Sequence, residues 1–89
     1  MTDVEQRRRR ALYRAQHRGT KEMDLVIGRF AETHLGGMDA AGLDHFEEFL
    51  ALPDPMLQGW ILTGDGTEPS AFKDLVAGVR RYHGLKDTA

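Results

Sequence analysis

Side chains that could do chemistry are few in this 89-residue chain, and they do not form a recognisable catalytic set. The only serine, Ser70, follows Pro69 where a helix is expected to start, so it is better explained as a helix cap than as a nucleophile. The histidines lie on four different expected helices, without the HxxxH or HExxH spacing of a metal site; they are His17, His34, His45 and His83. The Gly64-Asp65-Gly66 turn has no lysine directly after it and no strand before it, as a nucleotide-binding loop would require. The sequence therefore predicts a protein that is not an enzyme and that holds no metal and no cofactor of its own.

Charge is distributed unevenly along the chain. Residues 1–21 hold seven basic and two acidic side chains, a net charge of +5, whereas residues 22–89 carry −7. A basic first arm on an acidic body predicts a surface that docks on something anionic. The arginine run at 7–10 also leaves a nucleic-acid-binding protein as the main alternative, because arginines neutralise phosphates. An acidic body, a pI near 6.0 and the lack of a recognition helix argue against that alternative, and steep salt dependence would reveal it.

Length and composition set the outer bounds of the fold. A chain of 89 residues makes one domain, and without cysteine it has neither disulfides nor thiolate metal sites. Its longest apolar stretches fall far short of the roughly 20 residues that span a bilayer, and no apolar segment follows the N-terminal arginines to form a secretory signal. We expect a monomer that makes no contact with membranes and lies in the cytoplasm, or inside an organelle if a transit peptide has been removed.

Five helices are predicted, and no segment alternates as a strand would. They are expected over about residues 4–17, over about 21–35, from Asp39 to Pro53, from Asp54 through Trp60 and Ile61, and from Pro69 or Ser70 to Gly84. Short connections between them predict a compact, single-domain, all-α bundle of five helices over residues 1–89, with residues 1–6 and 85–89 frayed.

Caps and apolar stripes support these boundaries. Gly19 should end the first helix at a positive φ, while Asp39 and Asp54 should cap the third and fourth helices through their carboxylates. Apolar side chains recur at helical spacing in every segment, and Trp60 is expected in the core. We also expect Tyr82 to extend the buried face of the last helix.

The first inter-helix turn concentrates charged and flexible residues. Arg18, Gly19 and Glu22 combine a bidentate donor, a bare backbone and a carboxylate within five positions. Helix-end electrostatics alone could account for these residue types, since basic groups suit a helix C-terminus and acidic groups an N-terminus. A docking corner for another protein would require the same residues, and local physics leaves both explanations open.

A resemblance favours the docking corner. Arg18-Gly19-Thr20-Lys21-Glu22, followed by Asp24, resembles the RGxxE signature of the SdhE-type succinate dehydrogenase assembly factors. A second stretch, Asp54-Pro55-Met56-Leu57-Gln58-Gly59-Trp60, is similar to that family's D-P-x-L-x-x-W pattern, and the match runs over about residues 8–83. The chain departs from the family at Gln16, where many relatives carry an aromatic, and in its Gly64–Glu68 loop and its long Arg7–Arg10 run, whose roles stay open.

The resemblance implies a non-catalytic assembly factor, or chaperone. Such proteins are compact helical bundles that bind the flavoprotein subunit of succinate dehydrogenase or fumarate reductase and promote covalent attachment of its FAD. The residues implied in partner binding are Arg18, Gly19, Glu22, Asp24, Arg14 and Lys21. Which flavoprotein is the client, and whether FAD is contacted directly, stays open. A basic-armed nucleic-acid-binding protein or an antitoxin-like regulator is the alternative.

Overall fold

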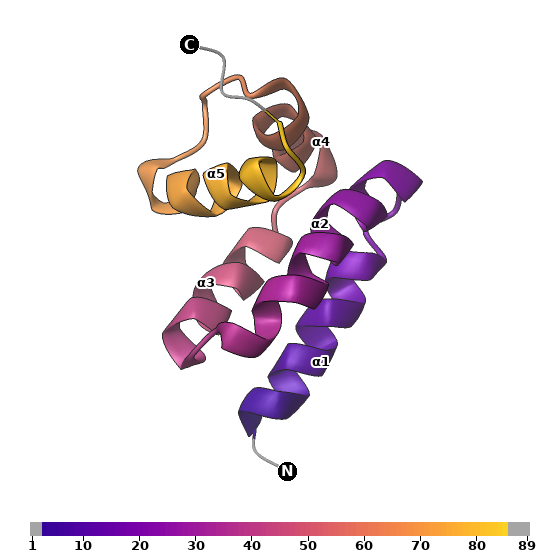
Figure 1. Cartoon of the computed structure of the whole chain (residues 1–89), viewed down its shortest axis with the longest axis vertical. Coiled ribbons are helices and arrows are strands. Elements are labelled where there is room, and N and C mark those ends of the chain that lie inside the picture. The colour runs from indigo at the N-terminus through magenta and orange to yellow at the C-terminus, as the bar shows by residue number, and fades with distance from the viewer. Residues whose placement is uncertain (1–2, 86–89) are drawn as a thin grey trace.

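The computed structural model describes residues 3–85, and within them the chain is all-helical with no strand (Figure 1). The α-helices are α1 (Asp3–Gln16), α2 (Lys21–His34), α3 (Ala40–Leu50), α4 (Asp54–Gln58) and α5 (Lys73–Tyr82). Short 3₁₀ turns cover Leu35–Gly37 and Ser70–Phe72, and a π-helical turn, Gly59–Thr63, extends α4. The predicted five-helix, all-α fold is confirmed.

The helices fall into two groups, one towards each end of the long axis of the molecule (Figure 1). Helix α1 packs along α2 and also against α3, and these three form one end of the molecule. Helix α5 packs on α2 and on the π-helical turn, so that α4 and α5 form the other end. The segment joining α3 to α4 runs between the two groups, close to the turn that joins α1 to α2.

The core is continuous across both groups. Its largest side chains without solvent exposure are Phe46, Phe49, Met23, Ile27, Leu43, Leu57, Ile61 and Val79. Trp60 is 5% exposed and stacks near Phe72 at a ring-centroid distance of 6.3 Å, which confirms it as a core residue. Tyr82, by contrast, is 41% exposed, so its predicted place in the core is wrong. Its hydroxyl instead pairs with Thr33 Oγ1 at 2.9 Å on the surface of α2.

Two of the three predicted side-chain caps are wrong. Asp39 caps α3 as expected, because its Oδ1 accepts from Gly42 N at 2.8 Å. Asp54 does not cap α4: the backbone carbonyl of Pro53 accepts from the first free amides, and the Asp54 carboxylate turns towards Arg18. Ser70 makes no side-chain cap either, since Phe72 N bonds to the Pro69 carbonyl.

The N-terminal end of the described chain is helical where the sequence predicted a frayed end. Residues 3–6, expected to be frayed, form the first turn of α1. Residues 1–2 and 86–89, which the same expectation covered, lie outside the described residues.

Candidate functional site

The turn between α1 and α2, residues 18–24, is hereafter called the corner. Helix α1 ends just before the corner, at Gln16. There the His17 Nδ1–H group donates to the Tyr13 carbonyl at 2.7 Å, which satisfies one of the free acceptors at the end of the helix. Gly19 then adopts φ +121°, a conformation that glycine reaches at little cost. Thr20 Oγ1 accepts from Met23 N at 3.2 Å and caps α2. Local signals in the sequence therefore suffice to start and end both helices here.

Asp24 holds the corner from within. Its Oδ1 accepts from the backbone N–H of Arg18 and, at 3.3 Å, from that of Gly19. A carboxylate in the first turn of α2 also interacts favourably with the helix dipole. Asp24 therefore closes the loop that precedes its own helix.

Arg18 points into the protein rather than out to solvent. Its Nε donates to Asp54 Oδ1 at 2.8 Å, its Nη2 to the Leu52 carbonyl at 2.8 Å, and its Nη1 to the Leu50 carbonyl. The side chains of Arg18 and Asp54 are only 9% and 20% exposed. The planar guanidinium thus joins the corner to the segment between α3 and α4, where the last carbonyls of α3 need donors.

Glu22 makes a second, looser connection to α4. Its Oε1 accepts from Gln58 Nε2 at 3.2 Å, and both side chains are exposed. The two sequence stretches that carried the resemblance are therefore adjacent in space, through Arg18–Asp54 and Glu22–Gln58.

The six residues predicted for partner binding separate into two groups. Arg14, Gly19, Lys21 and Glu22 are exposed around the corner, whereas Arg18 and Asp24 are half-buried and bonded to the chain itself. Sequence reasoning missed that Asp54 belongs to this cluster. Asp54 followed by Pro55 is a typical start of a helix, and nothing else in the sequence indicates that the Asp54 carboxylate accepts from Arg18.

The arginine run at 7–10 is partly committed to internal contacts. Arg7 bonds to Glu47 through Nε and Nη2, at 3.3 and 2.8 Å, and to Asp44 on the same helix, α3. The hydrogen bonds that Arg7 donates to these carboxylates, that to Glu47 first, raise the pKa of Arg7 above its ordinary value. Arg8 Nη2 donates to the Met38 carbonyl at 2.6 Å. Two of the four arginines therefore attach α1 to the rest of the bundle.

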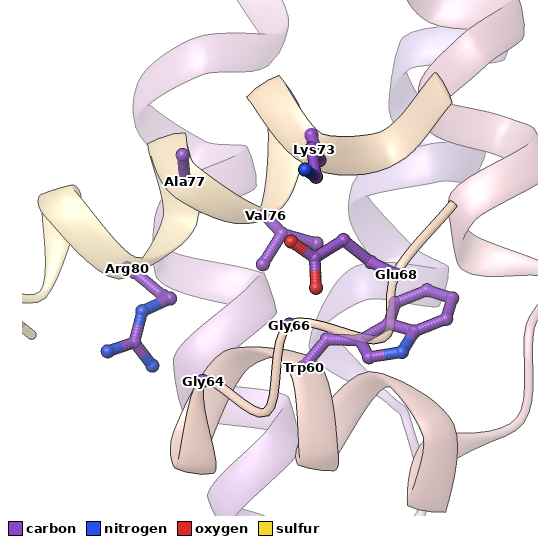
Figure 2. Close-up of a pocket in the computed structure, with 8 residues that line it drawn as sticks. All are labelled: Trp60, Gly64, Gly66, Glu68, Lys73, Val76, Ala77 and Arg80. Atoms are coloured by element: carbon purple, nitrogen blue, oxygen red, sulfur yellow. The ribbon is translucent and has the colours of Figure 1, made fainter. Parts of the chain in front are cut away.

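The Gly64–Glu68 loop borders a separate cavity of about 210 Å³ (Figure 2). Asp65 Oδ1 accepts from the Thr67 backbone and hydroxyl, and Thr67 Oγ1 accepts from Trp60 Nε1 at 3.0 Å. Arg80, 7% exposed, lies against Gly64 and donates to the Ile61 carbonyl inside the π-helical turn. These contacts give the loop, whose role the sequence left open, a structural task in covering Trp60.

Within residues 3–85, no group of three His, Asp or Glu side chains is placed to hold a metal ion. In the same part of the chain, no helix is long and apolar enough to cross a membrane.

Within the described residues, the fold is a small all-helical one with exposed polar side chains around the turn between α1 and α2. Residues 9–83 match the family model described as flavinator of succinate dehydrogenase. The chain therefore belongs to this family.

Curated relatives carry related names. The FAD assembly factor SdhE of Acetobacter pasteurianus is 47% identical over 55 residues, covering 62% of this chain and 50% of the relative. Its Coxiella burnetii counterpart of the same name is 30% identical over 64 residues, 72% of this chain and 78% of the relative. The mitochondrial succinate dehydrogenase assembly factor 2 of Dictyostelium discoideum is 29% identical over 87 residues, 98% of this chain and 61% of the relative. The chain thus spans about half to three fifths of the length of two of these relatives. No solved structure matches it significantly.

Proposed function

We propose that this protein is a non-catalytic assembly factor that binds the flavoprotein subunit of succinate dehydrogenase, or of fumarate reductase, and promotes covalent attachment of its FAD. The observation that carries the proposal is the family match over residues 9–83, which includes both the corner and the α4 stretch that the corner contacts. In this proposal the flavin belongs to the client, and the assembly factor has no cofactor of its own. We further propose that it acts as a monomer in the cytoplasm.

The proposed task is one of positioning. Covalent attachment of a flavin requires an aligned nucleophile and stabilised negative charge on the ring, and both depend on how the client's parts are held. A helper can restrain those parts without donating a reacting group. The corner suits such a role because a bare glycine backbone lets a client approach closely, while Glu22 offers an exposed acceptor beside it.

Within the corner, we assign different tasks to exposed and internal residues. Gly19 and Glu22 would contact the client, with Arg14 and Lys21 contributing charge at the rim. Arg18 and Asp24 would hold the corner in the conformation that binds the client, because their polar atoms bond to the chain itself. The nucleic-acid alternative receives no support from the comparisons, and the internal contacts of Arg7 and Arg8 leave a smaller basic surface than the sequence suggested.

The test is reconstitution with the purified flavoprotein subunit carrying non-covalent FAD. Flavin fluorescence that survives acid denaturation should rise faster with this protein than without it. Glu22→Ala should abolish the stimulation while keeping a native circular dichroism spectrum, since its dipole contribution is only a few tenths of a kcal/mol. Glu48→Ala removes another exposed glutamate, one that pairs with His45 within α3; it serves as the matched control and should stimulate normally.

Gly19 gives a second, steric arm to this test. An added Cβ would meet Asp54 Oδ2 at 3.5 Å, an ordinary contact, so Gly19→Ala suffers mainly from its positive φ and should still stimulate in proportion to its folded fraction. Gly19→Arg incurs the same backbone strain but fills the bare corner, and should not stimulate. Full stimulation by folded Glu22→Ala and Gly19→Arg would show that the client binds elsewhere.

A further inference from the structure

A groove of about 360 Å³ adjoins the corner, between the last turn of α1 and the segment that joins α3 to α4. Residues 50–53, Leu-Ala-Leu-Pro, line one side, on which Ala51 and Pro53 are exposed, Leu52 is half-buried and Leu50 is buried, and Tyr13, Arg14 and His17 line the opposite side. Arg18 and Asp54 close it towards the corner. The groove is therefore continuous with the surface proposed to bind the client.

Tyr13 is exposed but stacks on a neighbouring ring. It is 64% exposed, the most of any large apolar side chain in the described part of the chain. Its ring nevertheless stacks on the His17 ring, with centroids 4.0 Å apart, and His17 is itself held by its hydrogen bond to the Tyr13 carbonyl. An aromatic ring that contributes little to the core but is held in place loses little conformational entropy on binding, as tyrosines at protein interfaces do.

The groove carries a net positive charge. Arg18 and Asp54, both lining it, form an ion pair and neutralise each other. Arg14 lies at the rim, is exposed, and makes no ion pair with any acidic side chain of residues 3–85. An apolar side with an unpaired cation at its edge is complementary to a segment that presents an apolar side chain next to an acidic one.

We propose that this groove receives a segment of the flavoprotein client in which a large apolar side chain is followed closely by an aspartate or glutamate. The apolar side chain lies on Ala51, Leu52 and Pro53 beside the Tyr13 ring, and the carboxylate pairs with Arg14. This inference rests on the proposed function, because it supplies the client-side chemistry for the same site. It also gives the Arg18–Asp54 pair a purpose in binding, since both residues line the groove.

The first experiment maps the contact directly. The photo-reactive residue benzoylphenylalanine replaces either Tyr13 or Tyr82, the two exposed tyrosines, which lie on α1 and α5. After irradiation with the purified flavoprotein subunit, the Tyr13 replacement should cross-link to a client peptide that contains an acidic residue, and the Tyr82 replacement should not. A complex that forms but cross-links only from position 82, or from position 13 to a second copy of this chain, would overturn the inference.

The second experiment tests the charge. Arg14→Glu should weaken binding of the flavoprotein subunit at least about tenfold at low salt, whereas Arg81→Glu, the same reversal on an exposed α5 arginine, should leave the affinity within about twofold. Reversing the mapped client carboxylate to arginine should restore binding of Arg14→Glu. Equal affinity of Arg14→Glu and the unmodified protein would overturn the inference while leaving the proposed function intact. Absence of any complex with the unmodified protein would instead overturn both.

Discussion

Replacing Arg18 should cost far more stability than an arginine at a helix end normally does. Its guanidinium makes three hydrogen bonds to Asp54, Leu50 and Leu52, and its side chain is 9% exposed. Hydrogen bonds that involve a charged group contribute about 1.5–3 kcal/mol each, and removing one partner of a buried ion pair costs about 3–5 kcal/mol. Asp54 keeps 20% of its side chain exposed, so water compensates part of the loss. We therefore expect Arg18→Ala to lower the free energy of unfolding by about 3 kcal/mol.

Graded substitutions separate geometry from charge. Arg18→Lys keeps the charge, but a single ammonium cannot reach all three acceptors, so we expect a loss of about 2 kcal/mol. Asp54→Asn keeps an acceptor for Arg18 Nε and loses only the charge, so about 1 kcal/mol is expected. A ranking in which Arg18→Lys equals the unmodified protein would show that charge alone matters.

The assay is urea unfolding followed by far-ultraviolet circular dichroism, with the m-value monitored so that midpoint shifts report stability. Typical per-residue values give a chain of 89 residues a total of about 4–13 kcal/mol, so the Arg18→Ala loss should be large and measurable. Arg9→Ala, at an exposed arginine of α1, is the control and should change stability by less than about 0.5 kcal/mol. The hydrogen bonds of Arg18 to Asp54, Leu50 and Leu52 are hereafter called the Arg18 clamp. If Arg18→Ala costs no more stability than Arg9→Ala, the Arg18 clamp is refuted and Arg18 is free to contact the client.

Three further changes test other parts of the fold. Trp60→Ala should cost about 3–5 kcal/mol by urea unfolding, because the buried ring and its hydrogen bond to the loop are both lost; an unchanged midpoint would place the ring on the surface. Gly64→Ala should destabilise the protein by at least about 2 kcal/mol, since its Cβ would lie 2.9 Å from the Arg80 guanidinium. Gly66→Ala has open space around its Cβ and should cost only about 1 kcal/mol for its positive φ. Equal losses of stability would contradict the close approach of Gly64 and Arg80. Arg7→Ala should lower the melting temperature, and the difference should shrink between about 0.1 and about 1 M salt because solvent reaches the half-buried pairs with Asp44 and Glu47. A salt-independent difference would point to packing instead.

Local signals made most of the helices predictable. The first two helices were expected over 4–17 and 21–35, within one residue of Asp3–Gln16 and Lys21–His34 at each end. Periodicity, a capping aspartate at the start of α3 and a glycine at positive φ after α5 act over a few residues, so a sequence displays them directly. The π-helical turn had no such signal, because nothing in Gly59–Thr63 distinguishes it from a continued α-helix.

The sequence singled out the residues of the corner through their family resemblance, but it did not give their arrangement. It placed Arg18 at the partner contact, whereas the Arg18 guanidinium bonds to Asp54, Leu50 and Leu52 within the chain. Its acceptors lie 32 to 36 residues further along the chain, and two of them are backbone carbonyls, which every residue carries and no sequence pattern marks. The same non-local pairing explains why Asp54 was mistaken for a helix cap.

The Leu50 and Leu52 carbonyls also explain why the Arg18 clamp requires an arginine at position 18 and an acid at position 54, and not the reverse. An isolated ion pair can be inverted, and its stability then recovers in part when both partners are exchanged. Here an aspartate at position 18 would face the Leu50 and Leu52 carbonyls, which are acceptors themselves, and would leave both without donors. We therefore expect the exchanged variant Arg18→Asp with Asp54→Arg to be no more stable than Arg18→Asp alone, measured by the same urea midpoint. Recovery of more than about 1 kcal/mol in the exchanged variant would show that the ion pair, rather than the capped carbonyls, holds the corner to the α3–α4 segment.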